Sequence, residues 1–434
     1  MTARWLFIDM NGFFAAAEQH DHRALRGRPV GVTPTEGEAS GIIAASVEAK
    51  AAGVRMGMRP REARHACPDI AVLKARPDRY VELHKQLLDT TAKHAPVHKA
   101  YSIDEWAVRL ISDESEPAAA AALAERIRRQ IVDDLSPALR CSIGIAPSRL
   151  LAKIASDVRK PDGLTVLAPH NLPDAIEHLA LDDLTGISTG ILNRLHRHGV
   201  TTVRQLWELD AHQSRRIWGS VQGEHWWHGF HGHDLPEQPT RTRGVGHAHV
   251  LPPKLRNDEQ VFAILVRLLC KAAARARLID HWAHGLRVTV RYQQGPVWHD
   301  HAEFPATRDT PTLLHHLRDL WQRRPSRLRQ ADDTPRRPRR HAVGFTNPPA
   351  AYAPAVGPPK QVAIDLAGLT DNRNTPGPLF PDMHRPLRLT EAMDQINQRF
   401  GSHRVYFGSM HPVVDYLMED KIAFGRVPNE QVKM

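Results

Sequence analysis

The chain has 434 residues, of which 41% are hydrophobic and 24% are charged. This is the composition of a folded protein and excludes an intrinsically disordered one, and the length predicts about three or four domains. Lysines and arginines number 58 against 48 aspartates and glutamates, which gives a net charge of +10. The positive charge favours a polyanionic partner without identifying it.

Cysteines and apolar runs narrow the class of protein further. Cys67, Cys141 and Cys270 are far apart and form no CxxC spacing. We therefore expect no disulfide framework and no zinc site, and a reducing compartment. The N-terminus lacks a signal peptide pattern, and no apolar run approaches the ~18 residues of a membrane span. The sequence predicts a soluble, intracellular protein with no membrane partner.

Two stretches near the N-terminus carry acids that could bind metal ions. Residues 5–9 are an apolar run ending in Asp9, which predicts a buried strand whose last residue emerges at its end. A second strand, over 98–110, contains adjacent Asp104 and Glu105. Neighbouring strand residues point to opposite faces, so both reach one site only at a strand end or bulge, or through the longer glutamate. Carboxylates can hold Mg²⁺ for nucleotidyl transfer, although acids at strand ends more often cap or turn the chain.

Residues 181–209 have the pattern of two short helices joined by glycine-containing turns. Gly186 and Gly190 permit a tight turn whose backbone N–H groups can face a DNA phosphate, as in helix-hairpin-helix motifs. An αα-hairpin with a C-cap glycine explains the same residues equally well.

The next stretch predicts a β-α-β-β-α-β module. Its expected elements are strand 246–251, helix 259–278, strands 285–292 and 297–304, helix 311–322 and a final strand 340–346. Arg287 and Arg291 alternate with apolar residues, so one sheet face is basic and suits a duplex backbone, unless it is simply a solvated face. Residues 347–380, rich in Pro, Ala and Gly, predict a linker, and 389–400 an amphipathic helix.

Four motifs in this order resemble the signatures of the Y-family of DNA polymerases. They are residues 7–18 (FIDMNGFFAAAE), 45–58 (ASVEAK followed by GVRMGM), 101–105 (YSIDE) and 141–163 (CSIGIAPSRLLAKIASD followed by KPDG). The resemblance covers about residues 5–346.

The resemblance implies an α+β multidomain protein with the right-hand polymerase fold. It assigns the palm to residues 1–20 and 78–167, small fingers to 21–77, and a helix-hairpin-helix thumb to 168–238. The β-α-β-β-α-β little finger would be 239–348, and the linker and tail 349–434.

The resemblance also implies the metal site. Asp9, Asp104 and Glu105 would be the catalytic carboxylates that hold two Mg²⁺ ions, for which Mn²⁺ could substitute. The Met10 carbonyl would be a further metal ligand.

For the incoming nucleotide the resemblance implies contacts from Phe13, Phe14, Val47, Lys50 and Lys160. Phe14 would be the ring that excludes a 2′-hydroxyl, and Lys160 would contact the triphosphate. The family usually has Tyr and Arg where Val47 and Lys50 stand. Because Val47 donates no hydrogen bond and Lys50 is a point charge, weak nucleotide binding or an unusual substrate preference is expected.

The implied function is a template-dependent translesion DNA polymerase that extends primers past damaged template. Its expected partners are primer-template DNA, dNTP and a sliding clamp that binds Leu379 and Phe380, and it would act as a monomer at the cytoplasmic nucleoid. The alternative is a catalytically weak DNA and clamp adaptor in a mutagenesis complex. The three retained carboxylates favour the enzyme, because clustered negative charge is costly without a role.

Overall fold

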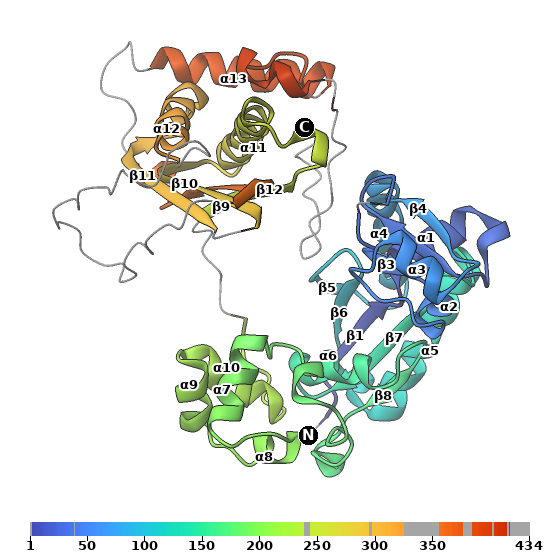
Figure 1. Cartoon of the computed structure of the whole chain (residues 1–434). Helices are drawn as coiled ribbons and strands as arrows, with labels where there is room; N and C mark the ends of the chain where they lie inside the picture. The colour runs from blue at the N-terminus through green and yellow to red at the C-terminus, as the bar shows by residue number, and fades with distance from the viewer. Residues whose placement is uncertain are drawn as a thin grey trace. The chain divides into compact units, whose positions relative to one another are not determined.

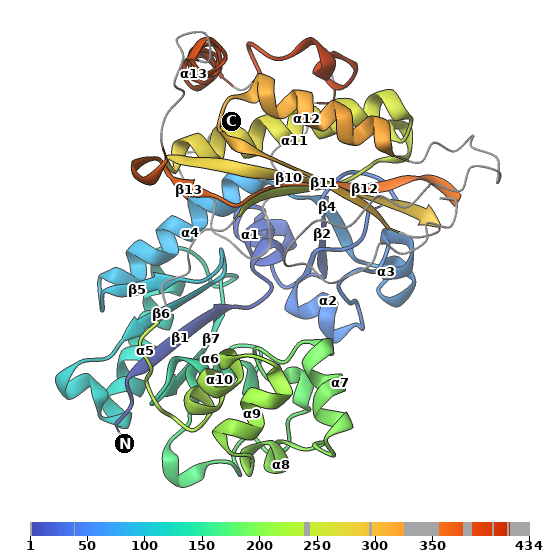
Figure 2. The ribbon, with the colours of Figure 1, turned by 90° about the vertical axis from the view of Figure 1, so that its left-hand side faces the viewer.

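The computed structural model describes residues 2–38, 40–237, 244–294, 297–324, 356–375, 384–401, 403–414 and 416. The chain divides into two compact units, with the division at residues 238/239 (Figures 1 and 2). Within the described ranges, no helix is both long and apolar enough to cross a membrane.

The centre of the first unit is a five-stranded sheet in the order β5-β6-β1-β7-β8. Its strands are β5 Val97–Ala100, β6 Glu105–Arg109, β1 Trp5–Met10, β7 Cys141–Ala146 and β8 Leu164–Val166. Strand β1 is buried along its whole length and pairs antiparallel with both β6 and β7. The predicted strand over 98–110 is therefore two strands, joined by a bend at residues 101–104.

Alternation along β1 divides the core of this unit into two. Leu6 and Ile8 pack with helices α1 (Phe13–Asp21), α4 (Pro77–Ala92) and α5 (Pro117–Asp134). Trp5 and Phe7 belong to the other cluster, with helix α6 (Arg149–Val158). Since strand side chains alternate with period two, Asp9 shares a face with Phe7 and lies on the α6 side.

The residues that lie between α1 and α4 in the chain form a smaller sheet, in the order β3-β2-β4. It comprises β2 Val30–Thr33, β3 Ala44–Ala45 and β4 Ala71–Lys74, with helices α2 Val47–Ala51 and α3 Pro60–Ala66. Residues including Ile42, Ala49 and Val54 make its own small core.

Four short helices complete the first unit and share a core with α6. They are α7 Thr189–Arg197, α8 Val203–Trp207, α9 Ala211–Trp218 and α10 Val221–Phe230. Gly186 (φ +95°) and Gly199 (φ +77°) occupy the turns before and after α7. The sequence predicted that Gly190 lies in the turn before this helix. Helix α7 starts at Thr189, so Gly190 lies instead in its first turn.

The second unit contains a five-stranded sheet in which β11-β10-β12-β9 are neighbours in that order and the short strand β13 (Thr370–Asp371) also pairs with β10. Helices α11 and α12 cover one face of this sheet (Figure 1). Its elements are β9 Gly244–Val250, α11 Asp258–Leu278, β10 His281–Gln294, β11 Trp298–Thr307, α12 Thr310–Arg323 and β12 Val356–Ala367. The predicted β-α-β-β-α-β order is present, with antiparallel pairing throughout this sheet.

Strand β12 corrects the predicted linker. The expected strand 340–346 lies outside the described residues, whereas β12, at 356–367, pairs with β10 and β9 within the stretch predicted to be a linker. Pro358 and Pro359 concealed it, because prolines argue against a central strand. They precede the alternating buried residues Val362, Ile364 and Leu366, and the β10–β12 register shifts near Pro359.

Residues after β12 also belong to the folded unit. Helix α13 (His384–Phe400) contains the predicted amphipathic segment and lies against α12. In the short 3-10 helix Gly408–Val413, Met410 and Val413 are buried in the core beside α11. The amphipathic helix expected in this tail therefore packs within the second unit.

Candidate functional site

Asp9 and Glu105 face each other across two paired strands. Asp9 stands opposite Glu105 in the antiparallel register of β1 and β6. Asp104 precedes β6 in the bend, and its carbonyl accepts a 2.9 Å hydrogen bond from the Met10 N–H. The pair Asp104-Glu105 thus lies at a strand start, where adjacent side chains can reach one region.

Two lysines from the α6 region neutralise these acids. The Lys153 ammonium contacts Asp9, Glu105 at 2.8 Å and Asp157 at 3.3 Å. The Lys160 ammonium lies 2.7 Å from carboxylate oxygens of both Asp9 and Asp157. Three carboxylates and two ammonium groups therefore form one cluster.

The pKa shifts reflect this concentration of charge. Burial opposes ionisation of Asp9, but Lys153 and Lys160 lower its pKa below the usual value. Burial and the neighbouring Asp9 charge raise the pKa of Glu105. Burial also opposes the charge on Lys153, yet Asp9, Asp157 and Glu105 raise its pKa. The site therefore favours a cation between Asp9 and Glu105.

The donor set fits a hard divalent cation, although the side chains are arranged around lysines. Among the residues that the structure describes, no three His, Cys, Asp or Glu side chains are placed so that together they could hold one metal ion. The Lys153 ammonium nevertheless bridges Asp9 and Glu105, which shows that these carboxylates accommodate a shared cation. The Asp104 carboxylate accepts a 2.5 Å hydrogen bond from the Ser102 hydroxyl. Carboxylate oxygens are the ligands that Mg²⁺ prefers.

The loop after β1 depends on glycine. Gly12 has φ +59°, a conformation that L side chains rarely adopt, and a Cβ there would lie 2.6 Å from the Ala45 carbonyl oxygen. This close approach joins the end of β1 to the segment that leads into α2.

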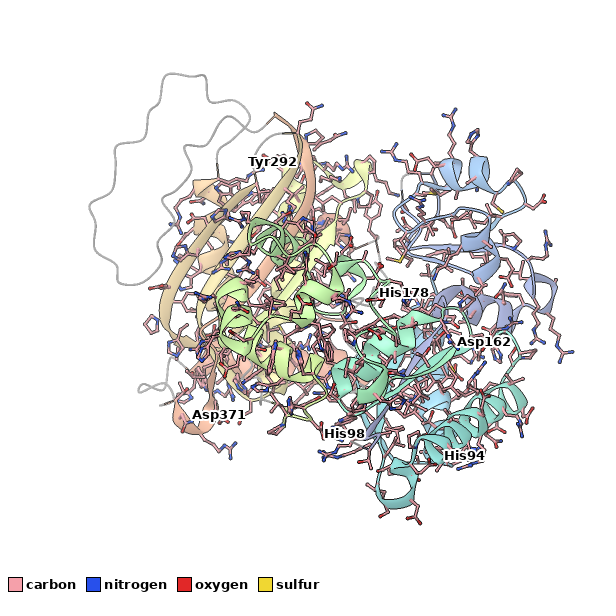
Figure 3. All side chains as sticks on the ribbon, turned by 90° about the horizontal axis from the view of Figure 1, so that it is seen from below. His94, His98, Asp162, His178, Tyr292 and Asp371 are labelled. Carbon is pink, nitrogen blue, oxygen red and sulfur yellow. The ribbon has the colours of Figure 1, made fainter. Side chains whose placement is uncertain are left out.

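Asn11 connects the end of β1 to the turn that carries Lys160. Its side-chain oxygen accepts a 2.8 Å hydrogen bond from the Asp162 N–H, and its amide nitrogen donates to Ser142 at 3.1 Å. Asp162, on that turn, is labelled in Figure 3. Asn11 thereby positions the Lys160 turn beside Asp9 without being a carboxylate.

The two predicted aromatic nucleotide contacts lie at the start of α1. Phe13 and Phe14 are 2% and 6% exposed and belong to the same core cluster as Leu6 and Ile8. The Phe14 ring stacks on Tyr80 with centroids 4.5 Å apart and an interplanar angle of 13°. Phe14 is thus backed by a second ring and retains a small exposed edge.

Val47 and Lys50 lie on α2, which Ser46 caps by accepting a hydrogen bond from Ala49. Val47 is half-buried. Lys50 is exposed as a whole residue, but nearby protein atoms remove part of the water around its ammonium group. This desolvation is the larger cause of its lowered pKa, and repulsion by Lys160 is the second. Asp9 and Asp104 oppose this shift, so Lys50 lies within electrostatic range of the acidic site.

The comparison with known proteins decides the family. Residues 8–157 match the impB/mucB/samB family, and residues 242–351 match the C-terminal domain of that family. DNA polymerase IV of Pelotomaculum thermopropionicum is 29% identical over 409 residues, which are 92% of this chain and 93% of the relative. DNA polymerase IV 1 of Bacillus subtilis is 30% identical over 66% of this chain and 69% of the relative. The chain belongs to the Y-family of DNA polymerases.

Solved structures confirm the predicted right-hand fold. A Y-family DNA polymerase chimera of Dbh and Dpo4 matches with a TM-score of 0.65 and 19% identity, over 85% of this chain and 100% of the other. The insertion ternary complex of Dbh DNA polymerase matches with a TM-score of 0.51 over the same shares. At this identity the likeness concerns the fold. Y-family enzymes are metal-dependent nucleotidyltransferases, in agreement with the acidic cluster.

Two residues of the charged cluster were not assigned a role from the sequence. Lys153 and Asp157 are one helical turn apart on α6, and Lys160 follows three residues later. The spacing i, i+4 between opposite charges was visible in the third motif. It could have indicated a shared face of α6, but not that this face meets Asp9.

The predicted DNA contacts lie in both units. A Cβ on Gly186 would lie 2.8 Å from the Trp226 indole nitrogen, so this glycine is required by packing as well as by its φ. Arg287 and Arg291 are exposed on the face of β10 away from the core, opposite Asp365 and Gln361 of β12. Leu379 and Phe380, the expected clamp contacts, lie outside the described residues.

Proposed function

We propose that the acids at the ends of β1 and β6 carry out nucleotidyl transfer in this chain. As a Y-family member, the chain is a template-dependent DNA polymerase of the translesion type. The observation that carries the site assignment is the register that sets Asp9 against Glu105 with one ammonium bridging both.

Asp9, Asp104, Glu105 and the Met10 carbonyl would hold two Mg²⁺ ions, or Mn²⁺ in their place. Divalent ions held there supply charge stabilisation for the attacking 3′-hydroxyl and the triphosphate. For this, the Lys153 ammonium has to leave Glu105, whereas it can keep its contact with Asp157.

Lys160 would bind the triphosphate of the incoming dNTP. Its ammonium already lies beside Asp9 on a turn held by Asn11, so a phosphate oxygen can replace one of its carboxylate contacts. Lys50 would add a second cation from α2, while Val47 can offer only an apolar contact. We expect weaker triphosphate binding than a Tyr and Arg pair would give.

Phe14 would exclude the 2′-hydroxyl of a ribonucleotide, with Phe13 packed behind it in the core. Stacking on Tyr80 supports this role, because a gating ring has to resist displacement.

Primer-template DNA would bind through backbone contacts at Gly186, Gly190, Arg287 and Arg291. Exposure of both arginines on one sheet face supports this assignment. We further propose that the enzyme acts as a monomer on nucleoid DNA in the cytoplasm, and that a sliding clamp binds Leu379 and Phe380.

Primer extension with Asp104→Ala tests the metal assignment. With Mg²⁺ and dNTPs, wild-type protein should extend a primed template and Asp104→Ala should lose at least about 100-fold in rate, because no other group replaces a missing metal ligand. Asp113→Ala, purified identically, is the matched control, since Asp113 is exposed in the 3-10 helix Ser112–Ser115. Equal activity in both variants would mean that Asp104 is not a metal ligand or that a contaminant polymerase acts.

A further inference from the structure

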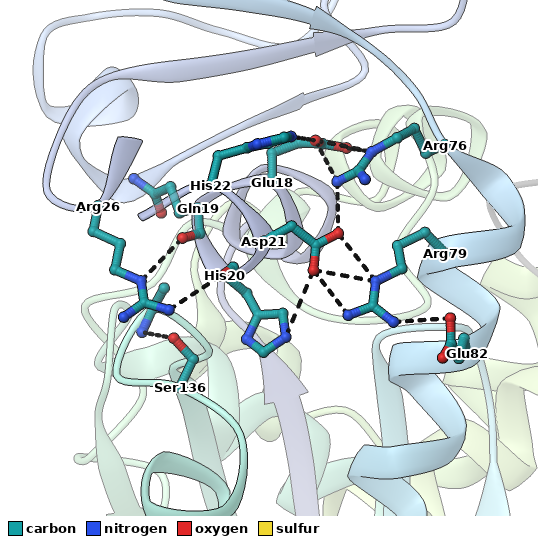
Figure 4. A network of polar contacts seen from close by, with 11 residues as sticks. Glu18, Gln19, His20, Asp21, His22, Arg26, Arg76, Arg79, Glu82 and Ser136 are labelled. Atoms are coloured by element: carbon teal, nitrogen blue, oxygen red, sulfur yellow. Dashed lines mark hydrogen bonds and ion pairs between the residues drawn. The ribbon is translucent and has the colours of Figure 1, made fainter. Parts of the chain in front are cut away.

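Helix α1 presents Phe14 and two acids along one face. Phe14, Glu18 and Asp21 follow the spacing i, i+4 and i+7, which places them on the same side of a helix. The first turn of α4 packs against this side and brings Arg76, Tyr80 and Arg79 to them. Figure 4 shows the polar part of this contact.

Glu18 is a buried carboxylate that accepts hydrogen bonds from two side chains, Arg76 and Tyr80. It is 1% exposed. Arg76 donates to it from Nε at 3.0 Å and from Nη2 at 2.7 Å, and the Tyr80 hydroxyl donates to Oε1 at 2.7 Å. Burying a charge is costly unless it is paired in this way, so Glu18 is under strong constraint to keep these partners.

The Tyr80 ring is held at both ends. Its face stacks on Phe14, and its hydroxyl is fixed by Glu18. Burial and this hydrogen bond raise the pKa of Tyr80, which keeps the hydroxyl protonated as a donor. Phe14 therefore rests on a ring that cannot slide or tilt away without breaking a hydrogen bond to a buried charge.

Asp21 offers a comparison within the same network. Its carboxylate accepts from Arg79 at 2.8–3.1 Å and from Arg76 at 2.8 Å (Figure 4). These bonds tie α1 to α4 as the Glu18 bonds do, but they end on guanidinium groups and not on the ring behind Phe14. Loss of the Asp21 charge would therefore weaken only the attachment of α1 to α4, whereas loss of the Glu18 charge would also weaken the hydrogen bond that holds the Tyr80 ring.

We propose that Glu18 is a positioning residue for sugar selection: by holding the Tyr80 hydroxyl it fixes the ring that backs Phe14. This inference rests on the proposed function of Phe14 as the ring that excludes a 2′-hydroxyl. A ribonucleotide differs there by one oxygen atom, so rejection depends on how little Phe14 can yield, and packed interiors transmit such constraint between touching groups. Glu18 touches neither substrate nor metal in this scheme and acts through Tyr80.

The test measures kcat/KM for a dNTP and for the matching rNTP in primer extension, and takes their ratio. Tyr80→Phe removes the hydroxyl while keeping the ring, and Glu18→Gln removes the charge at nearly constant volume. Both should lower the dNTP preference by about 3- to 10-fold, because only part of the roughly 10- to 150-fold that a hydrogen bond to a charged group is worth reaches Phe14 through the Tyr80 ring. Because both substrates are used by the same preparation, loss of folded protein cancels in the ratio.

Asp21→Asn is the matched control and should leave the ratio unchanged. Phe14→Ala distinguishes the role of Phe14 from the role of Glu18. If Phe14→Ala relaxes sugar selection while Tyr80→Phe and Glu18→Gln do not, the role of Glu18 is refuted and the role of Phe14 stands. If Phe14→Ala leaves the ratio unchanged, the proposed function of Phe14 fails first. A relaxation by Asp21→Asn equal to that by Glu18→Gln would also overturn the inference, since general cohesion would then suffice.

Discussion

Replacing Lys153 by methionine should destabilise the first unit in a way that divalent cations reverse. The substitution keeps most of the volume and removes the cation shared by Asp9, Glu105 and Asp157. Removing one partner of a buried ion pair lowers the free energy of unfolding by about 3–5 kcal/mol. Lys160 still pairs with Asp9, and the Glu105 side chain is 28% exposed, so solvent screening lowers our expectation to about 2 kcal/mol.

Calorimetric melting measures this effect directly. For a unit of this size about 2 kcal/mol corresponds to a fall in Tm of about 4–8 °C. About 10 mM MgCl₂ should raise the Tm of Lys153→Met more than that of wild type, because a bound cation replaces the lost ammonium.

The matched control for this experiment is Lys93→Met. Lys93 pairs with Asp134 at 2.6 Å, but its side chain is 58% exposed, and we expect a change within about 1 °C. Two results would refute the reasoning: a Lys153→Met variant that melts with wild type without Mg²⁺, or an equal Mg²⁺ response of both proteins.

Three further predictions concern the loop, the second unit and DNA. Gly12→Ala should cost about 2–4 kcal/mol in urea unfolding, because Gly12 has φ +59° and the added Cβ would meet the Ala45 oxygen at 2.6 Å; an unchanged midpoint would contradict this. Burial lowers the pKa of His247 from 6.5 to about 4. His247 therefore does not reduce the free energy of unfolding above pH 6.5, but it reduces it progressively as the pH falls toward 4, and His247→Gln should make this decrease smaller by about 2 kcal/mol. Replacing Arg287 and Arg291 by alanine should reduce the slope of log K against log salt for duplex DNA by about 1.8; an unchanged slope would remove them from the DNA interface.

Much of the fold followed from local pattern. The apolar run of β1, the alternation of Leu286 through Tyr292 and the periodicity of α11 were all visible along the chain, and each corresponds to an observed element. Failures occurred where local signals conflicted with the tertiary partner. The prolines at the start of β12 indicated a linker, but pairing with β10 and β9 on both sides made that segment a central strand.

The candidate site shows the same division. The acids and aromatic residues were found because each lies in a short motif of the chain. Lys153 had no assigned role, since its importance comes from a contact with Asp9 across 144 residues. Asp104 was expected with Asp9 and Glu105; its carboxylate accepts a hydrogen bond from Ser102, and its role in metal binding stays a prediction.

The sequence by itself determined which residue types are available and where strands and helices could form, because apolar periodicity and motif spacing are local properties. Only the tertiary structure decided what these residues meet. Strand register set Asp9 against Glu105, and helix packing brought Glu18 to Tyr80 from 62 residues away. Such contacts depend on the burial of surfaces distant in the chain, and for that reason no local pattern contains them.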